Sequence, residues 1–237
     1  MKYDVIIVGA GPGGIYSAYE LMKKCSDKKI AVFDSGYSLK KRHCPIDGEK
    51  VKACIKCKSC SIMSGFGGAG AFSDGKYNIT NDFGGTLYEY IGKKAATELM
   101  QYVDDINMAH GGEGTKMYST AGTNLKKVCL QNRLKLLNAS VRHLGTDINL
   151  VVLGQLYDEL KEHVDFYFES PVSHIECLEN GGYRVWSNDQ SYDCGKCIVS
   201  VGRSGSKWME HICKELDIPT KSNRVDIGVR VELPAVL

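Results

Sequence analysis

The chain has 237 residues, of which 43% are hydrophobic and 24% are charged, a composition typical of a globular protein with one or two domains and a sizeable core. Thirty Lys and Arg against 28 Asp and Glu leave a net charge of +2, so bulk charge gives no reason to expect nucleic acid or a membrane as a partner. We expect neither a signal peptide nor a membrane-spanning helix, and therefore a cytoplasmic protein.

The N-terminal stretch predicts a strand, a glycine turn, a helix and a second strand. An apolar run rich in β-branched residues covers Tyr3 to Val8, and the sequence GAGPGG follows it directly. A helical pattern then covers 15–24, and residues 30–33 are apolar again. This order is typical of a dinucleotide-binding βαβ unit.

The glycines have the spacing G-x-G-x-x-G. Gly9 permits the tight bend, Gly11 lets the backbone approach a pyrophosphate, and Gly14 lets the helix lie close against the strand. The helix N-terminus then offers free N–H groups to an anion. The predicted cofactor-binding glycines of this turn are Gly9, Gly11, Gly13 and Gly14.

An acidic residue closes the second strand. Asp34 lies 20 residues after Gly14, where its carboxylate can accept hydrogen bonds from both ribose hydroxyls and would repel a 2′-phosphate. The turn therefore predicts FAD or NAD, and not NADP. Ser35, the next residue, is included in the predicted site.

Residues 35–60 are polar and show no periodicity, which predicts a long loop, and loops of this length in compact domains are usually functional. Arg42 could reach the pyrophosphate as a bidentate donor, although an arginine solvated on a loop is the alternative.

Four of the ten cysteines fall within 17 residues: Cys44, Cys54, Cys57 and Cys60. Their spacing fits a [4Fe–4S] cluster with the remote cysteine first, and four thiolates would also suffice for zinc. Free or redox-active thiols beside the lysines of the loop are the third interpretation. Spacing alone leaves all three open.

The segment 61–78 contains five glycines between Gly65 and Gly75, with Phe66 and Phe72 among them. Flexible linkers rarely contain such aromatic residues, so we expect this loop to approach the cofactor, with Gly67 and Gly68 in contact.

The remaining pattern predicts helices and then strands. Thr146 or Asp147 can cap the last helix of the first group. Gly202 follows the last strand of the sheet in a second glycine turn, which we expect near the first. The predicted helices cover 85–105, 125–144, 148–162 and 208–216, and the predicted strands cover 164–170, 171–178, 183–187, 196–201 and 225–231.

Several motifs together resemble a bacterial family of largely uncharacterised FAD-dependent dehydrogenases, within the glutathione-reductase-like flavoproteins. They are GAGPGG with Asp34, Cys44-Pro45 with C-x-x-C-x-x-C, GFGGAGAFSDGK, RHLGTD at 142–147, SVGRSG at 200–205 and DIGVRVELP at 226–234. The resemblance implies an α/β fold: a Rossmann-like FAD/NAD(P)-binding three-layer ββα fold with an inserted, incomplete substrate domain.

This resemblance also implies how the chain is divided and where FAD would lie. The FAD-binding domain would take 1–90, with the Cys-rich loop 44–60, and 146–205; 91–145 would be a helical insertion, and 206–237 the start of a truncated substrate domain. The FAD pyrophosphate would lie over 9–14 with its ribose on Asp34, its adenine would be read by the backbone of Val172, and Gly202 would lie beside the cofactor.

The expected function is an FAD-dependent oxidoreductase, or its FAD-binding fragment, acting on a small-molecule substrate with NAD as a candidate electron donor. The alternative is a thiolate metal-binding redox module, with iron–sulfur or zinc, on a dinucleotide-binding scaffold. The C-terminal Gly-Asp segment that such flavoproteins carry is not found in the sequence, so we expect weak FAD binding. Neither the substrate nor the oligomeric state is predicted.

Overall fold

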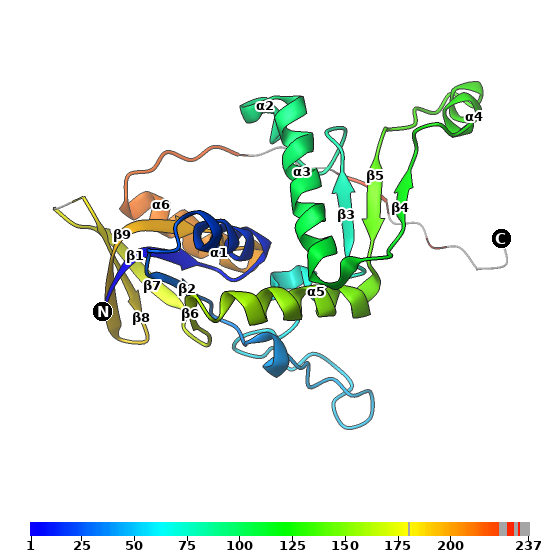
Figure 1. Cartoon of the computed structure of the whole chain (residues 1–237). Coiled ribbons are helices and arrows are strands. Elements are labelled where there is room, and N and C mark those ends of the chain that lie inside the picture. Colours follow the sequence, from blue (N-terminus) through cyan, green and yellow to red (C-terminus); the bar gives the residue numbers. More distant parts are fainter. Residues whose placement is uncertain (180, 223–226, 230–231, 233–237) are drawn as a thin grey trace.

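The computed structural model describes residues 1–179, 181–222, 227–229 and 232, and it contains two β-sheets (Figure 1). The larger sheet has six strands in the order β6-β2-β1-β9-β8-β7. The smaller one has three strands in the order β3-β5-β4 and lies at the opposite end of the molecule from the β7–β8 edge.

The centre of the larger sheet is parallel. β1 (Lys2–Val8) lies between β2 (Ile30–Phe33) and β9 (Gln190–Val199), and β6 (Val164–Tyr167) pairs with the outer side of β2. β8 (Tyr183–Ser187) and β7 (Val172–Cys177) extend the sheet as antiparallel strands. All four residues of β2 are buried, as expected for a parallel strand covered on both faces.

Helices cover both faces of this sheet. On one face, Val5 and Ile7 pack in a cluster with α1 (Pro12–Lys24) and α5 (Gly145–Leu160). On the other, Ile6 and Val8 share a cluster with Ile212 of α6 (Ser206–Glu215). This arrangement confirms the predicted α/β class, and most of its strands and helices lie within a few residues of the predicted ranges.

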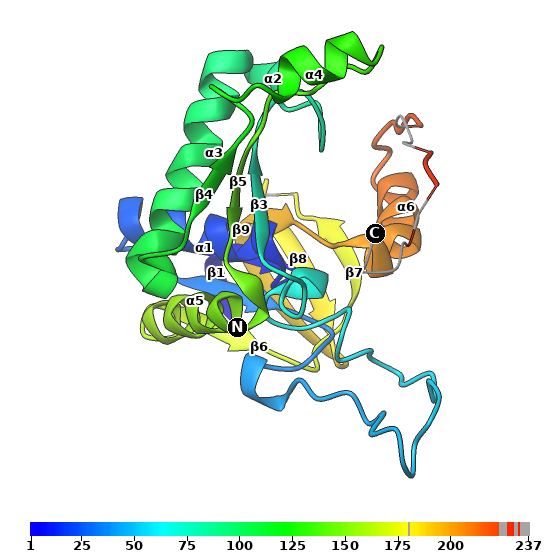
Figure 2. The same cartoon turned by 90° about the vertical axis from the view of Figure 1, so that its right-hand side faces the viewer.

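The smaller sheet consists of β3 (Lys76–Ile79), β5 (Ser140–His143) and β4 (Met117–Ser119), all antiparallel. α2 (Tyr88–Ile91) leads into α3 (Lys93–Asn107), which lies along this sheet and continues as one π-helical turn, Met108–Gly112. Figure 2 shows α3 on one side of the three strands and α4 (Leu125–Gln131) at their far end.

The prediction of a helical insertion over 91–145 is therefore wrong in two respects. The inserted unit contains a sheet, and that sheet begins with β3, before residue 91. The predicted helix 125–144 is short: α4 ends at Gln131 and residues 140–143 form the central strand β5. The leucines at 130, 134 and 137 have the spacing of one face of a helix, which is why a helix was predicted here. Residues 140–143 form a strand instead because they pair with β3 and β4.

Other boundaries are also corrected. The predicted helix 85–105 is divided by Gly92, whose φ of +82° places it in the left-handed region between α2 and α3. α5 begins at Gly145 after Leu144 and has no side-chain cap, so neither Thr146 nor Asp147 caps it. The predicted strand 225–231 lies largely outside the described residues.

Candidate dinucleotide site

The glycine turn lies between β1 and α1, and two of its glycines are required by packing. A Cβ on Gly14 would lie 1.8 Å from the carbonyl oxygen of Gly9. Gly9 has φ +103°, and a Cβ there would lie 2.7 Å from the carbonyl oxygen of Ser200. These contacts show the close helix-to-strand approach that the sequence predicts.

Gly11 is different because a Cβ there would meet its nearest neighbour only at ordinary van der Waals distance. It is the N-cap residue of α1, Pro12 is the first helical residue, and no side chain caps this end. The nearest atom to a Cβ on Gly11 would be the Cα of Gly68, 3.9 Å away. The helix N-terminus therefore has N–H groups that no side chain caps, at a position where the backbone carries no Cβ, and such N-termini bind anions.

Asp34 lies at the carboxyl end of β2 and is held against this turn. Its Oδ2 accepts a hydrogen bond from the Ala10 N–H (2.7 Å), and its Oδ1 accepts one from the Gly36 N–H (2.7 Å). The side chain is only half-buried, so each oxygen can still accept from a ligand hydroxyl. Ser35 beside it is exposed.

The glycine-rich loop packs directly on the glycine turn. The Gly67 N–H donates to the Ala10 carbonyl oxygen (2.8 Å), and a Cβ on Gly68 would lie 3.1 Å from the Cα of Gly11. The neighbouring Phe66 is fully buried against α5 and β6. The structure thus brings Gly67 and Gly68 to the predicted pyrophosphate position.

The other two predicted site residues, Val172 and Gly202, lie on segments far from the glycine turn in the sequence. The Ser170 N–H donates to the Asp34 carbonyl oxygen (2.9 Å), which places Val172, the first residue of β7, close to the end of β2. Gly202 is exposed and directly precedes the short 3-10 turn Arg203–Gly205.

Ser200 is a residue that sequence reasoning missed. Its N–H donates to the Val8 carbonyl oxygen (2.8 Å) and its Oγ donates to that of Gly9 (3.2 Å), so it joins the two glycine turns. Its position at the end of the last strand, opposite the first glycine of the turn, is the signal that could have identified it.

Arg42 has a structural position. It is 5% exposed, and it donates from Nε to the Ser61 carbonyl oxygen, from Nη1 to that of Phe66 and from Nη2 to that of Ile62, at 2.6–2.9 Å. Burial lowers the pKa of this guanidinium, whereas the Asp34 carboxylate raises it. The expected role as a solvent-accessible pyrophosphate donor is corrected: Arg42 closes the base of the long loop.

The cysteines of that loop are not gathered. Cys54, Cys57 and Cys60 are exposed and Cys44 is half-buried. Among the residues that the structure describes, no three His, Cys, Asp or Glu side chains are placed to hold a metal ion. The predicted iron–sulfur or zinc site is therefore not supported, because the C-x-x-C-x-x-C segment lies on an irregular loop that does not bring the thiols together.

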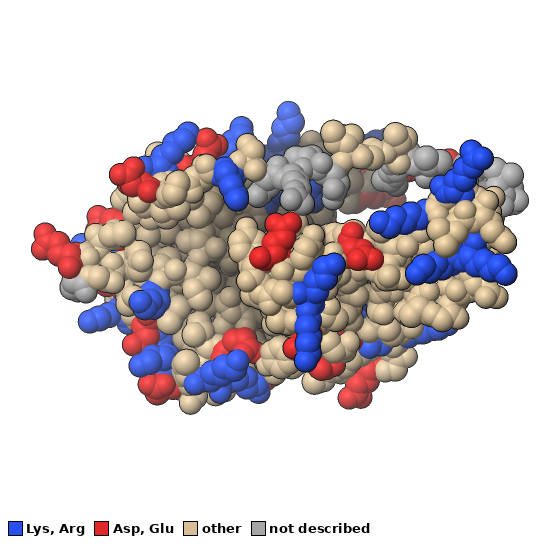
Figure 3. Space-filling model, turned by 90° about the horizontal axis from the view of Figure 1, so that it is seen from above, with Lys and Arg blue, Asp and Glu red and all other residues tan. Residues whose placement is uncertain are grey.

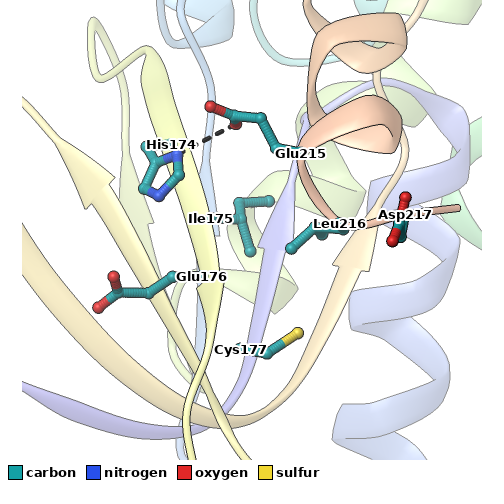
Figure 4. Close-up of a pocket in the computed structure, with 7 residues that line it drawn as sticks. All are labelled: His174, Ile175, Glu176, Cys177, Glu215, Leu216 and Asp217. Atoms are coloured by element: carbon teal, nitrogen blue, oxygen red, sulfur yellow. Dashed lines mark hydrogen bonds and ion pairs between the residues drawn. The ribbon is translucent and has the colours of Figure 1, made fainter.

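A shallow pocket of about 440 Å³ lies away from this site, between β7 and the end of α6 (Figure 4). Two of its polar side chains are paired, because Glu215 contacts His174 Nδ1 at 3.1 Å; Glu215 also contacts His211 Nε2 at 3.3 Å. The contact between His174 and Glu215 joins β7 to α6, and none of the pocket residues was predicted as a site residue.

Comparison with known proteins supports the fold. No protein-family profile matches the chain. An uncharacterised protein of Clostridium beijerinckii is 24% identical over 239 residues, which cover 100% of this chain and 38% of that protein. The chain therefore spans about two fifths of the length of this relative.

Among solved structures, glycine oxidase from Geobacillus kaustophilus is similar with a TM-score of 0.50 and 15% identity, covering 91% of this chain and 58% of that one. L-α-glycerophosphate oxidase from Mycoplasma pneumoniae, solved with FAD bound, has a TM-score of 0.48 and 14% identity, covering 90% and 57%. The fold is thus the Rossmann-like fold of FAD/NAD(P)-binding flavoproteins. In the described residues, no helix is long and apolar enough to cross a membrane.

Proposed function

We propose that this chain is the FAD-binding part of an FAD-dependent oxidoreductase. One observation carries the proposal: the uncapped N-terminus of α1 at Gly11, the Asp34 carboxylate bound to the Ala10 N–H, and the backbone of Gly68 lie next to one another. A dinucleotide needs this combination, because its pyrophosphate requires N–H donors and close backbone approach while its ribose requires an acceptor.

The residues fit a cofactor with a free ribose. The N-terminal N–H groups of α1 would hold the pyrophosphate, and Asp34 would accept hydrogen bonds from the ribose hydroxyls. The 2′-phosphate of NADP would lie against the same carboxylate and be repelled by its charge, so NADP is disfavoured. Val172, Ser35 and Gly202 are proposed as further contacts of the cofactor.

When bound, the flavin would supply hydride or electron transfer, and the protein would position it and exclude competing reactions. The Gly67–Gly75 loop would then lie near the flavin ring. A small molecule would be the substrate and NAD is the proposed electron donor, in a cytoplasmic enzyme. No observation favours the alternative of a thiolate metal module.

The test is FAD titration of the purified protein, followed by the quenching of flavin fluorescence, with NAD and NADP titrated in parallel. Gly11→Leu is the informative variant, because a Cβ there meets no atom within 3.9 Å, so the fold is retained while the side chain fills the pyrophosphate space. We expect FAD affinity to fall by at least about tenfold.

Gly154→Leu is the matched control, because a Cβ at this position of α5 also has no neighbour within 4 Å and lies away from the glycine turn. It should bind FAD as the parent protein does. Equal FAD affinity in the Gly11→Leu variant, or binding of NADP tighter than that of FAD and NAD, would contradict the proposal.

A further inference from the structure

The net charge of +2 conceals a strong local asymmetry. Residues 114–146 contain six Lys and Arg and no Asp or Glu, so the rest of the chain carries 24 basic and 28 acidic side chains. This segment includes β4, α4 and β5, and it forms the hairpin of the smaller sheet. The positive charge is therefore concentrated on one projecting part of the molecule.

The end of this hairpin, residues 124–137, is called the basic tip below. It holds α4 at the end of the molecule furthest from the β7–β8 edge (Figure 1). Figure 3 shows Lys and Arg side chains gathered at that end among uncharged residues. The charged residues of the basic tip are Lys126, Lys127, Arg133 and Lys135, and among the described residues none of them has an ion-pair partner.

The basic tip is also unusually apolar for an exposed surface. Leu130 and Leu134 are 64% and 62% exposed, and Leu125, Val128 and Leu137 are between 39% and 53% exposed. None of the five belongs to either buried core cluster. Exposed aliphatic side chains gathered in this way usually mark an interaction surface.

The cations and leucines line one groove of about 540 Å³. Lys126, Arg133 and Lys135 contribute charge to it, and Leu130, Leu134 and Leu136 contribute apolar surface. The acidic group at its edge, Asp82, accepts a hydrogen bond from the Asn138 N–H (3.0 Å). The groove thus pairs positive charge with an aliphatic wall, which matches a phosphate headgroup and an acyl chain.

We propose that the basic tip docks on an anionic phospholipid surface. Its cations meet the negative surface potential, which contributes a favourable free energy for each Lys or Arg near the membrane, and its leucines enter the boundary between headgroups and acyl chains. This is peripheral attachment, independent of the proposed cofactor.

Other occupants fit the tip less well. Residues 124–137 contain no aromatic side chain on which nucleic-acid bases could stack. A second copy of the tip would bring four more unpaired cations against these four, which is repulsive. An anionic bilayer is complementary to both the charge and the aliphatic surface.

The experiment is co-sedimentation of the full chain with phosphatidylcholine vesicles that contain or lack phosphatidylglycerol. We expect binding only to the anionic vesicles, weakening as salt is raised. Lys126→Glu/Lys127→Glu should lower the partition coefficient by about tenfold or more, and Leu130→Ser/Leu134→Ser should lower it as well, because the apolar contact is lost. Circular dichroism confirms that each variant is folded.

Lys50→Glu/Lys52→Glu is the matched control, since it makes the same change in net charge on the exposed cysteine loop. It should leave most of the vesicle binding intact. The proposal is overturned if neutral and anionic vesicles bind equally, if both tip variants bind like the parent, or if the loop variant loses as much binding as the tip variants. A dimer that the tip variants convert to monomer, without vesicle binding, would also overturn it.

Discussion

At the scale of single residues, packing and burial distinguish residues that the fold requires from residues available to a ligand, although the two look alike in the sequence. Gly14 and Gly11 are both glycines of one motif, but only Gly14 is required by packing, whereas Gly11 leaves space for a ligand. Arg42 is charged and lies on a loop, yet it is 5% exposed and binds three backbone carbonyl oxygens. Its contribution is therefore to stability.

Replacement of Arg42 tests this assignment. Arg42→Ala removes three hydrogen bonds from a charged donor and leaves buried carbonyl groups without partners, so we expect the free energy of unfolding to fall by about 3 kcal/mol. Arg42→Lys should not restore it, because an ammonium cannot reproduce the planar fork. Urea unfolding measures both, with exposed Lys41→Ala as a control that should change little.

At the scale of elements, α3 is fastened to the smaller sheet by one ion pair. Arg142 of β5 donates from Nε to Asp104 Oδ1 (3.1 Å) and from Nη2 to Asp104 Oδ2 (2.8 Å). Asp104 is 1% exposed, and its carboxylate raises the pKa of Arg142. Because both groups are largely out of water, each depends on the other.

Removing one partner of this ion pair should lower the free energy of unfolding, whereas replacing both partners with apolar side chains should lower it much less. We expect Asp104→Asn to lower the free energy of unfolding by about 3 kcal/mol, because it leaves a largely buried cation unpaired. Asp104→Leu/Arg142→Met should recover most of that loss, since no charge remains. Asp105→Asn, on the exposed side of the same helix turn, is the control. A loss in the double variant as large as that in Asp104→Asn would contradict this account.

At the scale of the whole molecule, α5 joins the two sheets. It packs against α1 on the larger sheet, and its Glu159 contacts Lys23 of α1 (2.6 Å) and His110 of the π-helical turn after α3 (2.7 Å). The His110 Nδ1 also lies 2.6 Å from the Ile106 carbonyl oxygen. One carboxylate therefore links both units, together with a hydrogen bond from Tyr16 to Asn107 (2.6 Å).

This link predicts a pH dependence. Lys23 and His110 hold the pKa of Glu159 below its ordinary value of 4.5, so its contribution to stability is fully present above about pH 4.5 and is lost as the pH falls through the lower folded-state pKa. The stability difference between the parent and Glu159→Gln should be largest near neutral pH and shrink below pH 4.5, as measured by urea unfolding across that range. A difference that does not depend on pH would contradict the role of this charge.

The local pattern of the N-terminal unit was enough to predict the dinucleotide fold and its turn. Gly9 to Gly14, Asp34 and the strand that ends before Gly202 could be identified from the sequence, because glycine spacing and β-branched runs determine conformation over a few residues. The loop with Gly67 and Gly68 was expected to approach the cofactor, and the structure shows that it packs directly on the glycine turn.

Contacts between residues far apart in the sequence determine the features that the local pattern does not predict. β4 and β5 contain no apolar run that would predict a strand, and they form because β5 pairs with β4 on one side and with β3 on the other. The spacing of Cys54, Cys57 and Cys60 could not show that the loop keeps these thiols exposed and apart, nor could residue type alone show that Arg42 is buried. Composition determined that the chain folds around a core, and the sequence places the basic residues and leucines of 124–137 next to one another. Only the tertiary structure determined that these leucines are exposed at a projecting tip, because exposure depends on how the rest of the chain packs.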